Sequence, residues 1–158
     1  MTIRKIFAAF IIAQTACNLD DKPGLKIQEQ NMLTAKIYFE QYTNHDFKKI
    51  ADLCSDTFEF KDPYSGQGIA KQNRLQTMAK HKKLPELTPG MRGDVMHQNS
   101  SNDNYIIVKF VSSGSAPDGT KWKFSLCTIF TIENGKIIKG YTSFDNWHNA
   151  IQQRARGF

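Results

Sequence analysis

Three features that this 158-residue sequence lacks exclude several classes of protein. Its longest uninterrupted apolar stretch, Ile6–Ala13, has eight residues, whereas a membrane-spanning helix needs roughly 18 or more. Three cysteines and four widely spaced histidines supply neither a disulfide framework nor the ligand spacing of a zinc site, so we expect no metal and no cofactor. The content of 40% hydrophobic, 11% aromatic and 23% charged residues excludes a collagen-like or largely disordered chain. These values indicate one globular domain.

The excess of positive charge is modest, with 21 Lys and Arg residues against 15 Asp and Glu residues. Most basic residues are scattered, and the one dense group is Lys80-His81-Lys82-Lys83. This group could meet an acidic partner, but we interpret it as the solvated end of a helix. No nucleic-acid motif and no alternation of basic with aromatic residues surrounds it, so we expect no nucleic-acid partner.

Residues 1–16 have the form of an export signal. Arg4 and Lys5 precede the short apolar run, and small residues follow it, as at a cleavage site. Thr15-Ala16-Cys17 resembles a bacterial lipobox, although Gln14 stands where an aliphatic residue is usual. We therefore expect an exported lipoprotein, anchored in the membrane through a lipid on Cys17 and located in the periplasm, at the outer membrane or on the cell surface. The alternative is an ordinary signal peptide with a chance cysteine.

Residues 17–28 contain Pro23 and Gly24 and little periodicity, which predicts a tether between the anchor and the domain. The acidic pair Asp20-Asp21 resembles the surface-export signal of Bacteroidetes lipoproteins. The domain itself is expected to occupy residues 29–158.

Within that domain, hydrophobic periodicity predicts helices first and strands afterwards. Apolar residues three and four positions apart favour helices, and alternation favours strands. The expected helices span 29–44, 47–54, 69–83 and 146–156, and the expected strands span 57–62, 92–98, 105–112, 121–132 and 136–144. Asn134-Gly135 predicts a hairpin between the last two strands. This order indicates an α+β fold. Cys54 and Cys127 fall in apolar elements, so we favour two buried free thiols over a disulfide.

Four stretches along the domain carry a resemblance to a known group of proteins. They are Tyr38–Asp46, Phe58–Pro63, Phe130–Ile137 and Phe144–Asn146. In this order and spacing they resemble the nuclear transport factor 2-like superfamily, and in particular its SnoaL-like and ketosteroid-isomerase-like branch. The resemblance implies a cone, in which a curved mixed or antiparallel sheet wraps around N-terminal helices as in a cystatin-like α+β roll. It also implies an apolar cavity inside the cone and, often, a homodimer through the outer sheet face.

The sequence independently favours such a cavity, because large rings gather on single faces of the predicted elements. Tyr38 and Tyr42 lie on the first helix, and His97 lies on a predicted strand. The other expected pocket residues are Phe58, Phe60, Trp122, Phe124, Thr128 and Phe130. The alternative is that these rings simply fill a core.

Asp62 and Tyr38 are the first candidates for chemistry. Asp62 continues the apolar face of its strand, where partial desolvation would raise its pKa and suit it to accept a proton. The resemblance implies that Asp62, before Pro63, is a proton-shuttling base and that Tyr38 donates to an oxyanion. The third group of that pattern, a protonated acid, is missing, because Thr128, or Cys127 if the turn is aligned differently, stands there. Asp62 could instead cap a turn, and Tyr38 could be a core aromatic.

Asp145 and His148 form a second candidate pair, in which the carboxylate would orient an imidazole base. Asp145 could instead cap the terminal helix. The function that we expect is binding of a small hydrophobic molecule, with isomerase-, cyclase- or dehydratase-type acid–base chemistry if the protein is an enzyme. The alternative is a non-catalytic dimeric interaction module that uses the outer sheet face.

Overall fold

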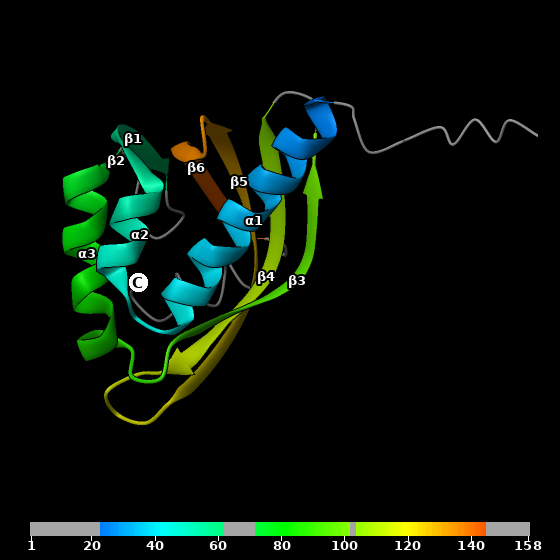
Figure 1. The fold of residues 1–158 in the computed structure, drawn as a ribbon. Coiled ribbons are helices and arrows are strands. Elements are labelled where there is room, and N and C mark those ends of the chain that lie inside the picture. The colour runs from blue at the N-terminus through cyan, green and yellow to red at the C-terminus, as the bar shows by residue number, and fades with distance from the viewer. Residues whose placement is uncertain (1–22, 62–71, 102–103, 145–158) are drawn as a thin grey trace, which may run out of the picture.

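The computed structural model describes residues 23–61, 72–101 and 104–144 of the chain. The helices are α1 (Pro23–Thr43), α2 (Phe47–Leu53) and α3 (Arg74–Leu87), and the strands are β1 (Cys54–Lys61), β2 (Gln72–Asn73), β3 (Arg92–Ser100), β4 (Tyr105–Ser115), β5 (Lys121–Glu133) and β6 (Lys136–Phe144). In Figure 1 the three helices lie on one side of a strongly curved sheet. The predicted α+β class is confirmed. No described helix has the length and apolar content to cross a bilayer.

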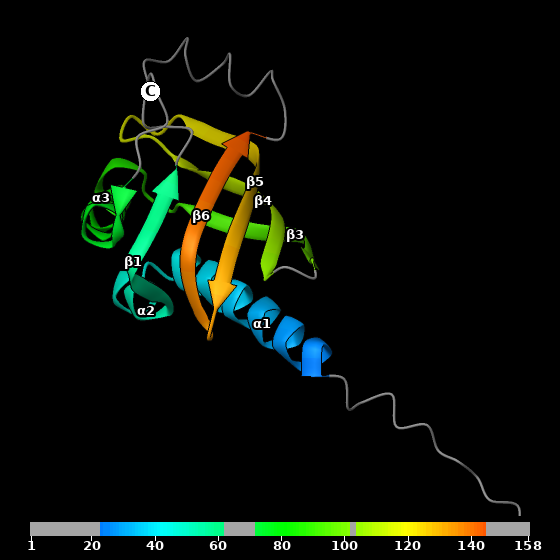
Figure 2. The same ribbon diagram turned by 90° about the horizontal axis from the view of Figure 1, so that it is seen from above.

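The sheet is mixed and open, with the strand order β2-β1-β6-β5-β4-β3. Strands β3 to β6 form an antiparallel meander, and β1 joins it in parallel with β6. The predicted hairpin between β5 and β6 is confirmed, because Asn134 and Gly135 have φ angles of 50° and 72°. A two-residue type I′ turn needs positive φ at both positions. Figure 2 shows β1 next to β6, at the end of the meander opposite to the edge strand β3.

Register shifts account for the curvature of the sheet. The pairing slips between Val95 and His97 in β3, between Cys54 and Glu59 in β1, and between Thr131 and Ile132 in β5. Such bulges bend a strand and increase its twist. The sheet therefore becomes concave toward the helices and encloses space that a flat sheet would leave open.

Strict alternation in β4 and β5 determines which side chains enter that space. In β5, Phe124, Leu126, Thr128 and Phe130 are buried, and the residues between them face outward or are only partly covered. The predicted apolar face of this strand is thus confirmed. Helix α1 covers one part of the concave face, where the Gln98 side chain donates a hydrogen bond to the carbonyl of Met32. Helix α3 lies near β1 at the other side (Figure 2).

The boundaries of α1 and α3 differ from the prediction by several residues. Helix α1 begins at Pro23, so residues 23–28, expected as tether, are helical. Proline is favourable in the first helical turn, because backbone N–H groups there make no hydrogen bond within the helix and the N–H that proline lacks is not needed. Helix α3 spans Arg74–Leu87 rather than 69–83. Its start is set by a capping box in which Asn73 and Gln76 each accept the backbone N–H of the other.

The second helix ends at Leu53, and Cys54 already belongs to β1. Cys54 and Cys127 are both free thiols, as predicted, but only Cys54 is buried. Cys127 is half-covered because it occupies an outward position of β5, between the buried Leu126 and Thr128. The expected helix at 146–156 lies outside the described residues.

Candidate functional site

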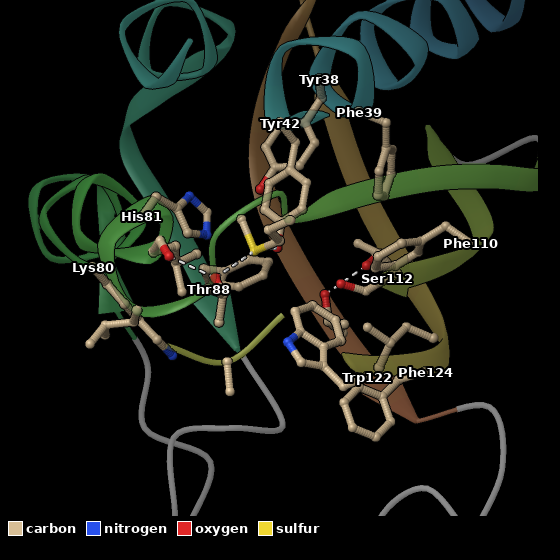
Figure 3. A pocket seen from close by; sticks show the side chains of 18 of the residues that line it. Tyr38, Phe39, Tyr42, Lys80, His81, Thr88, Phe110, Ser112, Trp122 and Phe124 are labelled. Carbon is tan, nitrogen blue, oxygen red and sulfur yellow. Dashed lines mark hydrogen bonds between the residues drawn. The ribbon is translucent and has the colours of Figure 1, made fainter. Parts of the chain in front are cut away.

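A cavity of about 800 Å³ lies between the concave sheet face, α1 and α3. Its volume is within the range of roughly 300–1,000 Å³ that is typical of small-molecule sites. Most of its lining is apolar or aromatic, and a few polar groups are spaced along its walls (Figure 3). The aromatic lining residues are Tyr38, Tyr42 and Phe39 of α1, Phe60 of β1, Phe110 of β4, and Trp122, Phe124 and Phe130 of β5.

These rings pack mainly on one another and so hold their positions without a ligand. The Tyr38 ring meets the Phe130 ring edge-on, with centroids 4.9 Å apart. Trp122 stacks on Phe124 at 5.5 Å and an angle of 18°. Edge-to-face and offset arrangements of this kind are favourable beyond the area that they bury. The cavity therefore has preformed walls of π faces and ring edges.

The position of Tyr42 depends on the segment that precedes β3. Its hydroxyl donates a hydrogen bond to the Sδ of Met91 at 3.1 Å, and His45 Nε2 contacts the Met91 carbonyl oxygen at 2.9 Å. Gly93 makes the approach possible, because a Cβ at that position would come within 3.1 Å of the Tyr42 ring. The C-terminal end of α1 is thereby fixed over the cavity.

The sheet contributes three buried hydroxyl groups to the cavity wall. Thr128 and Thr142 face each other across β5 and β6, with their oxygens 2.6 Å apart. Ser112 on β4 is 3% exposed and lines the same cavity. One hydrogen bond uses only one of the two threonine protons, since each hydroxyl has one donor proton and two lone pairs. The sheet wall can therefore offer hydrogen bonds to an uncharged oxygen on a ligand.

The opposite wall, on α3, carries an imidazole. His81 is 4% exposed, and its ring lies 5.9 Å from that of Tyr42 and 6.1 Å from that of Phe60. The interpretation of Lys80–Lys83 as a solvated helix end is wrong for His81, although Lys82 and Lys83 are exposed. Since α3 continues to Leu87, this group lies within the helix, and the helical period places His81 one turn after the buried Thr77.

Charged side chains occur only toward the rim among the described lining residues. They are Lys80 of α3 and Asp118 of the loop between β4 and β5. The backbone N–H of Thr120 donates to Asp118 at 2.8 Å, and this hydrogen bond lowers the pKa of the carboxyl. Asp118 is therefore an anion at neutral pH. No cluster of three or more His, Cys, Asp or Glu side chains within the described ranges could hold a metal ion.

Seven residues expected at a pocket or site from the sequence line this cavity. They are Tyr38, Tyr42, Phe60, Trp122, Phe124, Thr128 and Phe130. Phe58 does not line it; its ring packs in the core, stacked beside that of Phe60 at 5.9 Å. His97 does not line it either. The bulge after Val95 places His97 opposite the exposed Lys109, on the outer face of the sheet.

The remaining candidates, Asp62, Asp145, His148 and Cys17, lie outside the described residues. The relation between Asp62 and Tyr38 thus stays a prediction. Sequence reasoning missed His81, Ser112 and Met91 as cavity residues. The capping-box residues Asn73 and Gln76 could have indicated that His81 faces the cavity. A helix that begins after Asn73 has Thr77, His81 and Leu84 on one face.

The described strands thus form a curved, cone-like sheet with an aromatic cavity under the first helix. A sequence profile described as the SnoaL-like domain matches residues 35–140, more than half of the chain. The chain therefore belongs to the SnoaL-like domain family. No curated protein sequence compared with this chain matches it.

Solved structures with the same fold come from several bacteria. IdmH of Streptomyces antibioticus, described as a candidate polyketide cyclase, is 14% identical with a TM-score of 0.68, covering 80% of this chain and 99% of its own. An LEH-like epoxide hydrolase of M. tuberculosis is 12% identical with a TM-score of 0.66, covering 82% and 92%. An NTF2-like protein of Burkholderia pseudomallei is 17% identical with a TM-score of 0.67, covering 80% and 95%. At these identities the likeness shows the fold alone.

Proposed function

We propose that this chain is an exported, lipid-anchored SnoaL-like domain protein that binds a small, largely apolar molecule in its cavity. The observation that carries the proposal is the cavity of about 800 Å³, walled by aromatic rings and bordered by the hydroxyls of Ser112, Thr128 and Thr142. Such a set of apolar walls with a few convergent polar groups is typical of ligand sites. The descriptions of two structural neighbours, as a candidate polyketide cyclase and as an LEH-like epoxide hydrolase, are in keeping with it.

If the protein is an enzyme, we expect isomerase-, cyclase- or dehydratase-type acid–base chemistry, with Asp62 as base and Tyr38 as donor. Thr128 replaces the protonated acid of the isomerase pattern, and its hydroxyl already forms a hydrogen bond with Thr142. A hydroxyl donates more weakly to a developing oxyanion than a carboxylic acid does. Binding is therefore the part of the proposal to be tested directly.

The test is titration of the full chain with N-phenyl-1-naphthylamine, a neutral apolar fluorophore that brightens in an apolar site. Ser112→Phe places a ring inside the cavity and should reduce the affinity at least tenfold. Its matched control is Ser113→Phe, one residue along β4, where the alternation of the strand directs the ring outward. Equal affinity for both variants, or no saturable binding to the unaltered chain, would contradict the proposal.

A second function, association through the outer sheet face, is favoured by a separate observation. Ile107, Ile129 and Tyr141 lie directly opposite one another across β4, β5 and β6, and they are 42%, 37% and 42% exposed. A contiguous apolar row on a surface is typical of a protein interface. Ile129→Lys should convert a dimer to a monomer in sedimentation velocity. The control Leu75→Lys changes an 80% exposed residue on α3 and should have no effect.

A further inference from the structure

His81 is a buried polar group that a purely apolar binding site does not need. Rings from three different elements hold its imidazole, since it lies 5.9 Å from Tyr42 of α1, 5.9 Å from Phe47 of α2 and 6.1 Å from Phe60 of β1. Figure 3 shows the imidazole projecting from α3 toward Tyr42, on the side of the cavity opposite Ser112. A ring confined in this way has little freedom to turn away from a ligand.

Among the described lining residues, five side chains can exchange a proton. They are Tyr38, Tyr42, Lys80, His81 and Asp118. The hydrogen bond from Thr120 lowers the pKa of Asp118, so this carboxylate is a poor proton acceptor at neutral pH. Phenols and ammonium groups ordinarily exchange protons well above neutrality, and imidazole is the side chain that ordinarily does so near it.

We propose that His81 exchanges a proton with the molecule in the cavity, and that this molecule is an apolar, ring-bearing compound with a weakly acidic O–H group, such as a phenol or an enol. In the step, the O–H bond of the ligand breaks and an N–H bond forms on the imidazole. The electron pair of the O–H bond stays on the ligand oxygen, and the reverse transfer restores both partners. No other reactant is consumed.

The charge balance of this step suits an apolar cavity. Transfer to His81 converts two neutral groups into an adjacent anion and cation, whose attraction offsets part of their desolvation. Loss of the same proton to water would leave a single uncompensated anion in the cavity. The other charged and titratable groups in the described lining are Tyr38 and Tyr42 of α1, Lys80 of the same helix as His81, and Asp118; of these, Tyr42 has its ring 5.9 Å from that of His81. The proposal rests on the proposed binding function and adds the class of ligand.

The experiment uses two probes of nearly the same shape with the full chain. 4-Nitrophenol can give up a proton, and its phenolate absorbs visible light, whereas 4-nitroanisole has no acidic proton. At a pH where the free phenol is mostly protonated, binding to the unaltered chain should raise the phenolate fraction severalfold. Binding to His81→Gln should lower that fraction below its value in water, because an apolar site without a base disfavours the anion.

The matched control is His97→Gln, which removes an exposed histidine on the outer face of the sheet. It should behave as the unaltered chain. An unchanged or lowered phenolate fraction with the unaltered chain, or an equal rise with His81→Gln, would overturn the role of His81. Failure of 4-nitroanisole to bind would instead refute the binding function itself, so the two failures are distinguishable.

A measurement on the unaltered chain covers the case in which His81→Gln does not fold. The ring nitrogens of His81 can be followed by long-range proton–nitrogen correlation NMR. Their shifts should move to the imidazolium pattern when 4-nitrophenol is added and remain unchanged with 4-nitroanisole. Equal shifts with both probes would show a change of surroundings without proton transfer and would contradict the proposal.

Discussion

The hydroxyl oxygens of Thr128 and Thr142 lie 2.6 Å apart, on residues directly opposite each other in β5 and β6. Replacing either threonine by valine keeps the shape and removes this hydrogen bond, which should cost about 0.5–1.5 kcal/mol of unfolding free energy. The double variant should cost less than the sum of the single variants, because both remove the same bond. Urea unfolding of all four chains gives the coupling. Strict additivity would mean that the pair does not stabilise the sheet.

Gly140 is the point at which β6 passes closest to the aromatic core. A Cβ there would lie 2.6 Å from Cδ2 of Phe60 and 3.3 Å from Cε1 of Phe130. Gly140→Ala should therefore destabilise the protein by about 1–3 kcal/mol through overpacking. Gly24→Ala in α1, where nothing lies within 4 Å of the added Cβ, should be neutral or stabilising by up to about 1 kcal/mol. Thermal unfolding compares them, and equal effects would contradict the packing argument.

Cys54 should make stability fall at alkaline pH. Burial raises the pKa of its thiol from 9.0 to about 12, against the opposing effects of Arg74 and Lys136. Because the thiol has a higher pKa in the folded chain than in the unfolded chain, it stabilises the folded state fully at pH values below the pKa of the unfolded chain. This stabilisation is lost as the pH rises from about 9 toward about 12. Only the unfolded chain releases its proton in that window.

The measurement is urea unfolding at several alkaline pH values, for the unaltered chain and for Cys54→Ala. The difference in unfolding free energy between them should shrink by a few kcal/mol across the window. Cys127→Ala is the matched control, because Cys127 is the less buried thiol. A difference that does not change with pH would show that Cys54 is not desolvated.

Lipidation of Cys17 stays a prediction of the sequence. In the native host, the unaltered chain should fractionate with membranes and incorporate a labelled fatty acid. Cys17→Ser should release it and abolish the label. Cys127→Ser should leave both unchanged. Recovery of the unaltered chain in the aqueous fraction, or with its N-terminal methionine retained, would be inconsistent with an anchor.

The role of Asp62 is likewise open to a direct test. If Asp62 is a partly desolvated functional carboxylate, Asp62→Asn should keep or raise the melting temperature while changing the affinity for 4-nitrophenol. If it caps a turn, substitution should cost about 0.5–2 kcal/mol and leave binding unaltered. Asp46→Ala sets the scale of a lost cap, because the Asp46 side chain accepts the N–H of Lys49 at the start of α2.

The difference between prediction and structure is clearest at the two histidines. The sequence predicts His97 in the pocket, but one extra residue in β3 reverses the face of every side chain beyond it. A bulge leaves no mark in the alternation pattern that would identify it beforehand. The sequence pattern predicts a helix that stops at residue 83 and places His81 at its solvated end, whereas α3 continues to Leu87.

The sequence by itself determined the order of the described elements other than the short strand β2, the apolar face of β5 and the hairpin at Asn134-Gly135. These features depend on local periodicity and on the φ angles that particular residues allow. Only the tertiary structure decided which side chains meet across the cavity. The Thr128–Thr142 bond joins neighbouring strands, and the contact between His81 and Tyr42 joins α3 to α1. These contacts depend on the register of the strands and on the packing of helices that are far apart in the sequence. Neither can be read from a short stretch of sequence.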